Sequence, residues 1–230
     1  VKRAWAEASF AIGDVRFGRV PFHWGLGILH NSGDDINNDF GDQVDGIFFS
    51  TRLGDHFLTP GYSIAYTGPL GRRPGIFSTT QGQQNYLPEE PGVRVPIETS
   101  SMTHVLSLSL LKRDSDFITA KKNEEGRAIF NYGALAAYRH QTLDINDHQP
   151  NDDLSALSKK IFKREGNVGE LSLWSELIYD TFHLEMEAAG VLGKYADSDK
   201  KNVWLLRGGL ALESRYGFLN DRLQIGLDGG

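Results

Sequence analysis

The stretch RAWAEASFAIGDVRFGRVPFHWGLGIL, residues 3–29, decides the fold that we expect for this chain. In an extended strand its first part would place small or apolar residues on one face, namely Ala4, Ala6, Ala8 and Phe10. Gly13-Asp14 is a turn dipeptide, which predicts an antiparallel hairpin between residues 3–12 and 14–28. The apolar phase of the second arm shifts between Phe17 and Val20, which predicts a β-bulge near Gly18 or Pro21.

The rest of the chain repeats this alternation. Further strands are expected over residues 46–53, 58–67, 102–112, 128–142, 169–179, 182–192, 204–215 and 223–227. Their connections are short at 13–14, 54–56, 180–181 and 217–221, and long at 30–45, 68–101, 143–168 and 196–201, where residues 155–165 suggest a surface helix. Alternating short turns and long loops are typical of transmembrane barrels. The fold class that we predict is all-β, an antiparallel transmembrane up-and-down β-barrel, with residues 1–230 forming a single segment of about ten strands from a larger barrel.

Most charges fall on one face of the predicted strands. A lipid-facing charge near the bilayer midplane costs about 2–4 kcal/mol, so this face is expected to line a pore. The pore-lining candidates are Arg16, Arg52, Arg139, Glu176, Glu185, Glu187, Arg207, Glu213 and Arg215. Their nearly balanced signs predict weak ion selectivity. The opposite face is expected to form one lipid-facing band that includes Leu106, Leu108, Leu110, Leu171, Leu173, Leu184, Trp204, Leu206, Leu210, Leu223 and Ile225.

The composition excludes several classes of protein. The chain has 230 residues, no cysteine and a formal net charge of −6, which excludes disulfides and thiolate sites and argues against a nucleic-acid partner. A run of about 18 apolar residues is absent, so no transmembrane helix is expected. Residues 1–10 have no apolar core of a signal peptide, so we expect a longer precursor. These strands are therefore not expected to close a barrel alone.

No pattern in the chain indicates catalysis. Asp34, Asp35, Asn37, Asp39 and Asp42 are oxygen ligands suited to Ca²⁺, but their spacing misses the EF-hand, which favours a solvated loop. The glutamates Glu176, Glu185 and Glu187 fit a glycosidase pair less well than pore charges facing Arg207 and Arg215. Zinc-binding His pairs, phosphate loops and nucleophile motifs are absent. We therefore expect no enzyme activity, no metal and no cofactor.

Two stretches resemble a known family. Residues 16–29 (RFGRVPFHWGLGIL) together with NSGDDINNDFGDQVDGIFF, and the ending LALESRYGFLNDRLQIGLDGG, are similar to uncharacterised porin-like outer-membrane β-barrel proteins of Gram-negative bacteria. The resemblance implies a location in the cell outer membrane, with membrane lipid, including lipopolysaccharide, as the surroundings. Its motifs are strand and turn patterns, so it implies architecture more strongly than substrate.

Three functions remain open from the sequence. The first is a porin-like channel for passive diffusion of small hydrophilic solutes. The alternative is a barrel-anchored structural or interaction protein that binds a partner protein through the long loops at 68–101 and 143–168. A soluble barrel with a ligand inside is the third, and it would require the apolar face to point inward.

Overall fold

The structure is a computed structural model that describes residues 3–34, 43–65, 77–80, 83–86, 103–145, 161–196, 201–218 and 223–230. The first strands are Ala4–Phe10 (β1), Gly13–Pro21 (β2), Gln43–Leu53 (β3), His56–Ala65 (β4), Phe77–Thr80 (β5), Gln83–Tyr86 (β6) and Thr103–Lys112 (β7). After the helix Asp116–Glu124 (α1) come Ile129–Ile145 (β8), Ile161–Tyr179 (β9), Phe182–Ala196 (β10), Asn202–Phe218 (β11) and Leu223–Gly229 (β12).

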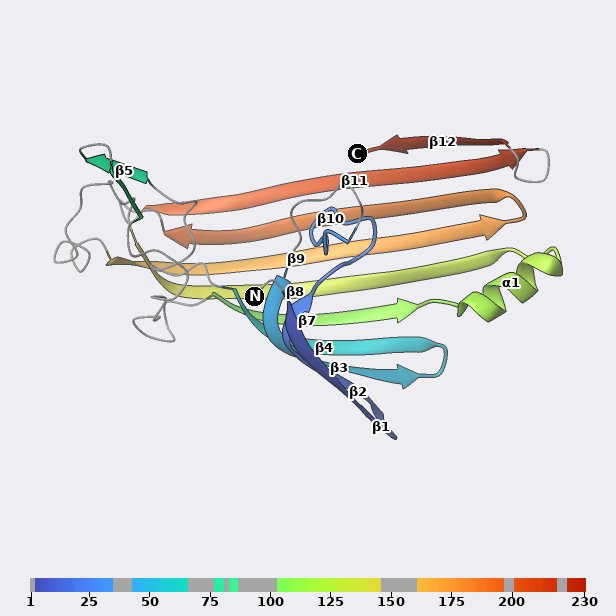
Figure 1. Cartoon of the computed structure of the whole chain (residues 1–230), viewed down its shortest axis with the longest axis horizontal. Coiled ribbons are helices and arrows are strands. Elements are labelled where there is room, and N and C mark those ends of the chain that lie inside the picture. Colours follow the sequence, from blue (N-terminus) through green and yellow to red (C-terminus); the bar gives the residue numbers. More distant parts are fainter. Residues whose placement is uncertain are drawn as a thin grey trace.

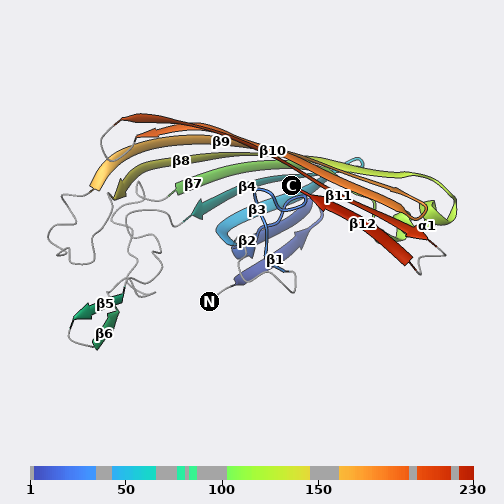
Figure 2. The same cartoon turned by 90° about the horizontal axis from the view of Figure 1, so that it is seen from above.

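Ten of these strands form one antiparallel sheet in the order β1-β2-β3-β4-β7-β8-β9-β10-β11-β12 (Figure 1). Each strand pairs with its neighbour along the chain, apart from the separate β5-β6 hairpin, so the up-and-down antiparallel all-β prediction is confirmed. The sheet curves into a trough (Figure 2). It does not close, because β1 and β12 form its two edges and do not pair with each other.

The first hairpin differs from the prediction at both of its ends. Its turn is at residues 11–12, and Gly13 and Asp14 already pair with Phe10 and Ser9. Gly13 has a positive φ of 147°, and a side chain at this position would collide with the backbone of β3. Both features require glycine there. At the other end β2 stops at Pro21, so the predicted bulge and the continuation to residue 28 are wrong.

Two long strands extend into a predicted loop. β8 reaches Ile145 and β9 already begins at Ile161, so the flanks of the expected loop 143–168 are paired strand. Residues 161–165 of the expected surface helix are also strand, and residues 146–160 lie outside the described part of the chain. The pairing shifts register between Gln141 and Leu143, which marks an irregularity in this ladder.

Helix α1 occupies the connection between β7 and β8, where no helix was predicted. The Ser115 hydroxyl accepts a hydrogen bond from the Ile118 backbone N–H and caps the helix, while Lys121 and Lys122 lie in its last turn. In the part of the chain that the structure describes, no helix is long and apolar enough to cross a membrane. α1 lies at the end of the sheet that also has the short turns after β3 and β9 (Figure 1).

Candidate functional site

One face of the ten-stranded sheet is apolar across its whole width. The register places side by side, from β1 to β11, the residues Ala6, Phe17, Ile47, Tyr62, Leu106, Tyr138, Gly169, Leu192 and Leu206. A parallel row contains Leu58, Leu110, Ala134, Leu173, Ala188 and Leu210. Many of these side chains are exposed, and Leu206 reaches 81% and Leu210 64%. The predicted band therefore lies on one face, with Leu223 excepted because its side chain is outside the described set.

A row of mostly polar residues bounds this apolar face toward the ends where β2, β8 and β10 terminate. We call it the polar row, and from β2 to β11 it consists of Arg19, Asp45, Ile64, His104, His140, Asn167, Lys194 and Trp204. Arg19 and Asp45 form an ion pair at 2.7 Å. The hydroxyl of Tyr62, from the neighbouring apolar row, lies 2.6 Å from Nδ1 of His104. The outward surface thus changes from apolar to polar at one level along the strands.

The other face of the sheet, which we call the polar face, carries all nine predicted pore-lining residues together with buried apolar side chains such as Phe48, Leu135 and Trp174. Three of the predicted arginines form ion pairs: Arg16 with Glu7 at 3.2 Å, Arg139 with Glu170 at 2.5 Å, and Arg52 with Asp55 at 4.0 Å. Arg52 lies at the β3–β4 turn, where it donates to the Gly54 carbonyl. Arg207 and Arg215 of β11 form no ion pair with any described residue. The predicted charges therefore share one face, although apolar side chains lie among them and their signs are not evenly mixed.

Residues 22–34 leave β2 and cross the polar face, so we call them the inward segment. The Trp24 indole N–H donates to Oγ of Ser172 at 3.1 Å, and Trp24 packs with Leu135 and Trp174. The segment turns back on itself, because the Trp24 N–H bonds the His30 carbonyl at 3.0 Å. Gly25 and Gly27 adopt positive φ values of 55° and 87°, which an extended arm could not contain. Trp24 is buried where the inward segment meets the sheet.

Glu187 of β10 fastens the inward segment to the sheet. Its side chain is fully buried, with 0% exposure. One carboxylate oxygen accepts from the Ser172 hydroxyl at 2.7 Å, and the other accepts from the Ile28 backbone N–H at 3.2 Å. A buried carboxylate needs such donors, because an unsatisfied one would cost several kcal/mol or more. Glu187 was predicted to face open water, and the structure instead places it beneath the inward segment.

A second set of contacts fixes the far end of the inward segment. Nε2 of His30 lies 3.3 Å from Glu170, which Arg139 also pairs, and the His30 and Glu170 side chains are almost entirely buried. Arg3, the residue before β1, donates to the Ser32 carbonyl at 2.7 Å and pairs with Asp34 at 2.5 Å. Hydrogen bonds from the Ser32 side chain and from Arg3 lower the pKa of Asp34. The other acidic-loop candidates, Asp35 to Asp42, lie outside the described residues.

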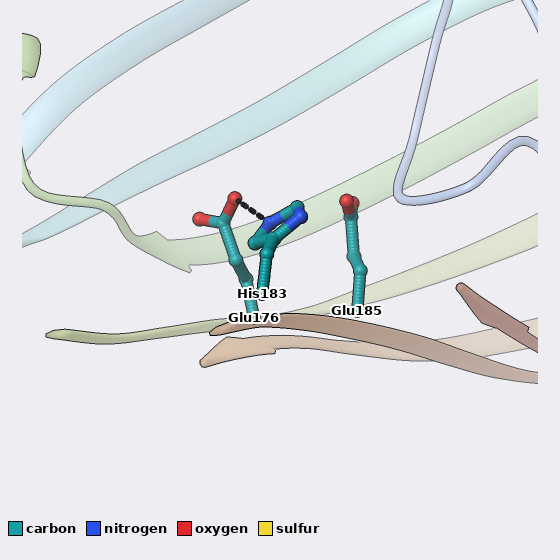
Figure 3. Close-up of side chains that lie close together, drawn as sticks. All are labelled: Glu176, His183 and Glu185. Atoms are coloured by element: carbon teal, nitrogen blue, oxygen red, sulfur yellow. Dashed lines mark hydrogen bonds and ion pairs between the residues drawn. The ribbon is translucent and has the colours of Figure 1, made fainter. Parts of the chain in front are cut away.

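Glu176, His183 and Glu185 converge on the polar face near the β9–β10 turn (Figure 3). Glu176 and Glu185 are direct partners across the ladder, and His183 is two residues before Glu185, so all three point the same way. One donor atom from each lies within 4.8 Å of the others, and Nε2 of His183 is 3.0 Å from Oε1 of Glu176. Glu176 is buried and the other two are partly exposed.

The same level of the sheet carries a row of carboxylates. Glu185 also pairs directly with Glu213 of β11, and Glu213 pairs with Asp228 of β12. Like charges placed directly opposite each other on neighbouring strands repel, which costs stability unless a cation compensates them. His183 and Arg215, which face each other one step along, are the nearest basic partners in this region. The balance of charge here is negative, contrary to the expectation of evenly mixed signs.

The geometry defines an all-β protein with one open, curved sheet, an apolar face and a polar face crossed by an inward segment. Sequence periodicity predicted both faces but not the inward segment or the Glu-His-Glu cluster. The signal for the cluster was present, because Glu176 and Glu185 flank a two-residue turn symmetrically. No protein-family model, curated protein or solved structure matches the chain.

Proposed function

We propose that this chain forms part of the wall of an outer-membrane β-barrel that works as a porin-like channel for small hydrophilic solutes. The observation that carries the proposal is the apolar face ending at the polar row. Soluble monomers rarely expose apolar patches larger than a few hundred Å². A sheet face that is apolar from β1 to β12 must therefore be shielded from water. Lipid can shield such a face because it contacts every strand of a barrel wall.

The height of the apolar band supports a bilayer as that cover. On β10 the outward apolar residues run from Phe182 to Leu192, and Lys194 follows in the polar row. At about 3.3 Å per residue and a tilt of about 45°, this stretch rises roughly 23 Å, close to the apolar band of about 25 Å in such barrels. Aromatic residues at the other end, including Tyr179 and Tyr216, suit the second interface.

Lipid also sets a condition on the two edges of the sheet. Unpaired backbone groups on β1 and β12 would each cost several kcal/mol in hydrocarbon, so both edges require partner strands within the membrane. We therefore propose that the ten strands are one part of a larger closed wall.

The polar face would then line the channel, and the inward segment would narrow it. Buried contacts through Trp24, Glu187 and His30 hold this segment against the wall rather than leaving it free in solution. Arg16 and Arg139 are already paired, and near the β9–β12 turns the basic partners His183 and Arg215 are outnumbered by carboxylates, namely Glu176, Glu185, Glu213 and Asp228. Rings of side-chain charge set the ion preference of a pore, so we expect preference for cations.

Planar-bilayer recording tests the channel directly. The protein should give discrete conductance steps with a reversal potential that reports cation preference in a salt gradient. Replacing Arg207 and Arg215 by Ser should increase that preference, because it removes two positive charges that no described residue pairs. Arg127→Ser, on the exposed connection after α1, is the matched control and should leave the reversal potential unchanged. Absence of conductance steps from a folded protein would refute the channel and favour a barrel that anchors a binding surface.

A further inference from the structure

We propose that Glu176, His183 and Glu185 form a Zn²⁺-binding site on the polar face, independent of whether the barrel conducts. Zn²⁺ is bound in proteins by imidazole nitrogen and carboxylate oxygen at about 2.0–2.2 Å. Two ligands of a tetrahedral zinc at that distance lie roughly 3.3 Å apart. The 3.0 Å between Nε2 of His183 and Oε1 of Glu176 is close to this value, and the third ligand is within 4.8 Å.

Hydrogen bonds from neighbouring side chains orient both carboxylates. Asn131 donates to Oε2 of Glu176 at 2.7 Å and leaves Oε1 directed at His183. The Trp174 indole N–H donates to Oε1 of Glu185 at 2.6 Å, so one oxygen of that carboxylate stays available. Asn131 is itself fixed, because its amide oxygen accepts from the Asp114 backbone N–H at 2.9 Å. Groups of this kind around metal ligands hold them in binding geometry and typically alter affinity by about 10–100-fold.

The surrounding charge favours a divalent cation. The ion pair between His183 and Glu176 compensates one carboxylate at most. Glu185 then remains opposite Glu213, which in turn faces Asp228. A Zn²⁺ between Glu176 and Glu185 would offset this excess, whereas the imidazolium alone would not.

The site would have an open coordination position. Three protein ligands leave a tetrahedral zinc one place for water. His183 and Glu185 are partly exposed toward the polar face, which gives a metal ion a route of entry. Glu176 closes the site on the other side because it is buried against Asn131. The site would thus bind zinc from the water that contacts this face.

Metal titration of the full chain in detergent tests the site. After chelator treatment, Co²⁺ added alone should give the intense visible absorption of a four-coordinate site at one ion per chain, and Zn²⁺ should displace it. His183→Gln and Glu185→Gln preserve side-chain size and remove one ligand each. Either should weaken Co²⁺ and Zn²⁺ binding by at least about tenfold. Glu7→Gln removes a carboxylate of the same face, far along the sheet on β1, and should bind both metals like the unmodified chain.

Two results would overturn the site. One is the absence of Co²⁺ absorption from the folded, unmodified chain at micromolar metal. The other is Zn²⁺ binding that stays equally tight in both ligand variants. If His183→Gln fails to fold, Glu185→Gln decides between the outcomes, since Glu185 makes no ion pair with a described residue. Loss of metal binding leaves the conductance experiment unaffected, so the two proposals fail separately.

Discussion

Replacing Glu187 by Ala should release the inward segment from the sheet. The fully buried carboxylate accepts the Ser172 hydroxyl with one oxygen and the Ile28 N–H with the other. Its removal leaves both donors without this acceptor and weakens the chain of bonds from Trp24 through Ser172. Residues 22–34 should therefore open far more often than in the unmodified protein, while the ladders on both sides of β10 remain.

The free-energy cost of opening that Glu187→Ala removes can be worked out from the two hydrogen-bond donors that lose their acceptor. A buried donor left unpaired costs about 1–3 kcal/mol, and the Ile28 N–H can recover part of this by meeting water when the segment opens. A net loss of about 2 kcal/mol raises the open population by roughly thirtyfold. Cleavage of a briefly opened segment follows its equilibrium population when reclosing is fast, so the rate should rise by the same factor.

Limited digestion with chymotrypsin measures this release. Phe22, Trp24 and Leu26 supply cleavage sites inside the segment, and mass spectrometry identifies the cut. Glu7→Gln is the control, because its exposed ion pair with Arg16 contributes only about 0–1 kcal/mol. If Glu187→Ala is cut within residues 22–28 no faster than the control, the carboxylate does not hold the segment.

Three further results are expected. Gly25→Ala should also speed cleavage there, since Gly25 has a φ of 55° and an added Cβ would lie 2.8 Å from Glu187; unchanged cleavage would contradict this close approach. Burial raises the pKa of Asp114, but the Lys122 hydrogen bond and the charges of Lys112 and Lys122 outweigh it, so the net shift is downward. The carboxylate therefore stabilises its connection above the unfolded pKa, and the hydrogen-exchange protection factors of residues 115–125 should fall as pH drops below about 4, but not in Asp114→Asn. Leu108→Arg should destabilise the protein in vesicles by about 2–4 kcal/mol, and Ser107→Arg much less; equal effects would refute the assignment of faces.

Strand periodicity predicted most of the fold because the two faces of the sheet meet different surroundings. Leu106, Leu108 and Leu110 on β7 all lie on one face, as their spacing predicts, and Ser107 and Ser109 lie on the other. The same pattern located β3, β4, β7, β8 and β10 to β12 to within a few residues, and it found β9 but not its first part, Ile161 to Val168. A period of two is readable from one sequence because it depends only on local geometry.

The inward segment could not be read in this way. Val20, Phe22, Trp24, Leu26 and Ile28 alternate as a strand would, and their pattern was interpreted as a continuing arm. These residues do not continue the strand. They are held instead by a distant partner, since the Trp24 indole donates a hydrogen bond to Ser172 of β9. Gly25 and Gly27 were the available warning, because both take backbone angles that interrupt a strand. Contacts over such sequence separations override local pattern.

The Glu-His-Glu cluster was missed for a related reason. Metal ligands were sought as paired histidines at helical spacing, whereas here the ladder brings the ligands together. Glu176 and Glu185 become neighbours only once the turn at Asp180-Thr181 fixes the register of β9 against β10. Asp180 adopts a positive φ of 52° in that turn. Placing His183 beside Glu176 thus required the register, which the alternating pattern leaves free in steps of two residues.

Spin labels on adjacent residues of single strands test most directly whether the apolar face meets lipid. In reconstituted vesicles, labels at Leu206 and Leu108 should be relaxed by oxygen, which concentrates in the bilayer. Labels at their neighbours Arg207 and Ser107 should be relaxed by a water-soluble nickel complex instead. This alternation is the predicted result. Access of the nickel complex to Leu206 and Leu108, as free as its access to Arg207 and Ser107, would contradict a membrane wall, because the apolar face would then meet water rather than lipid.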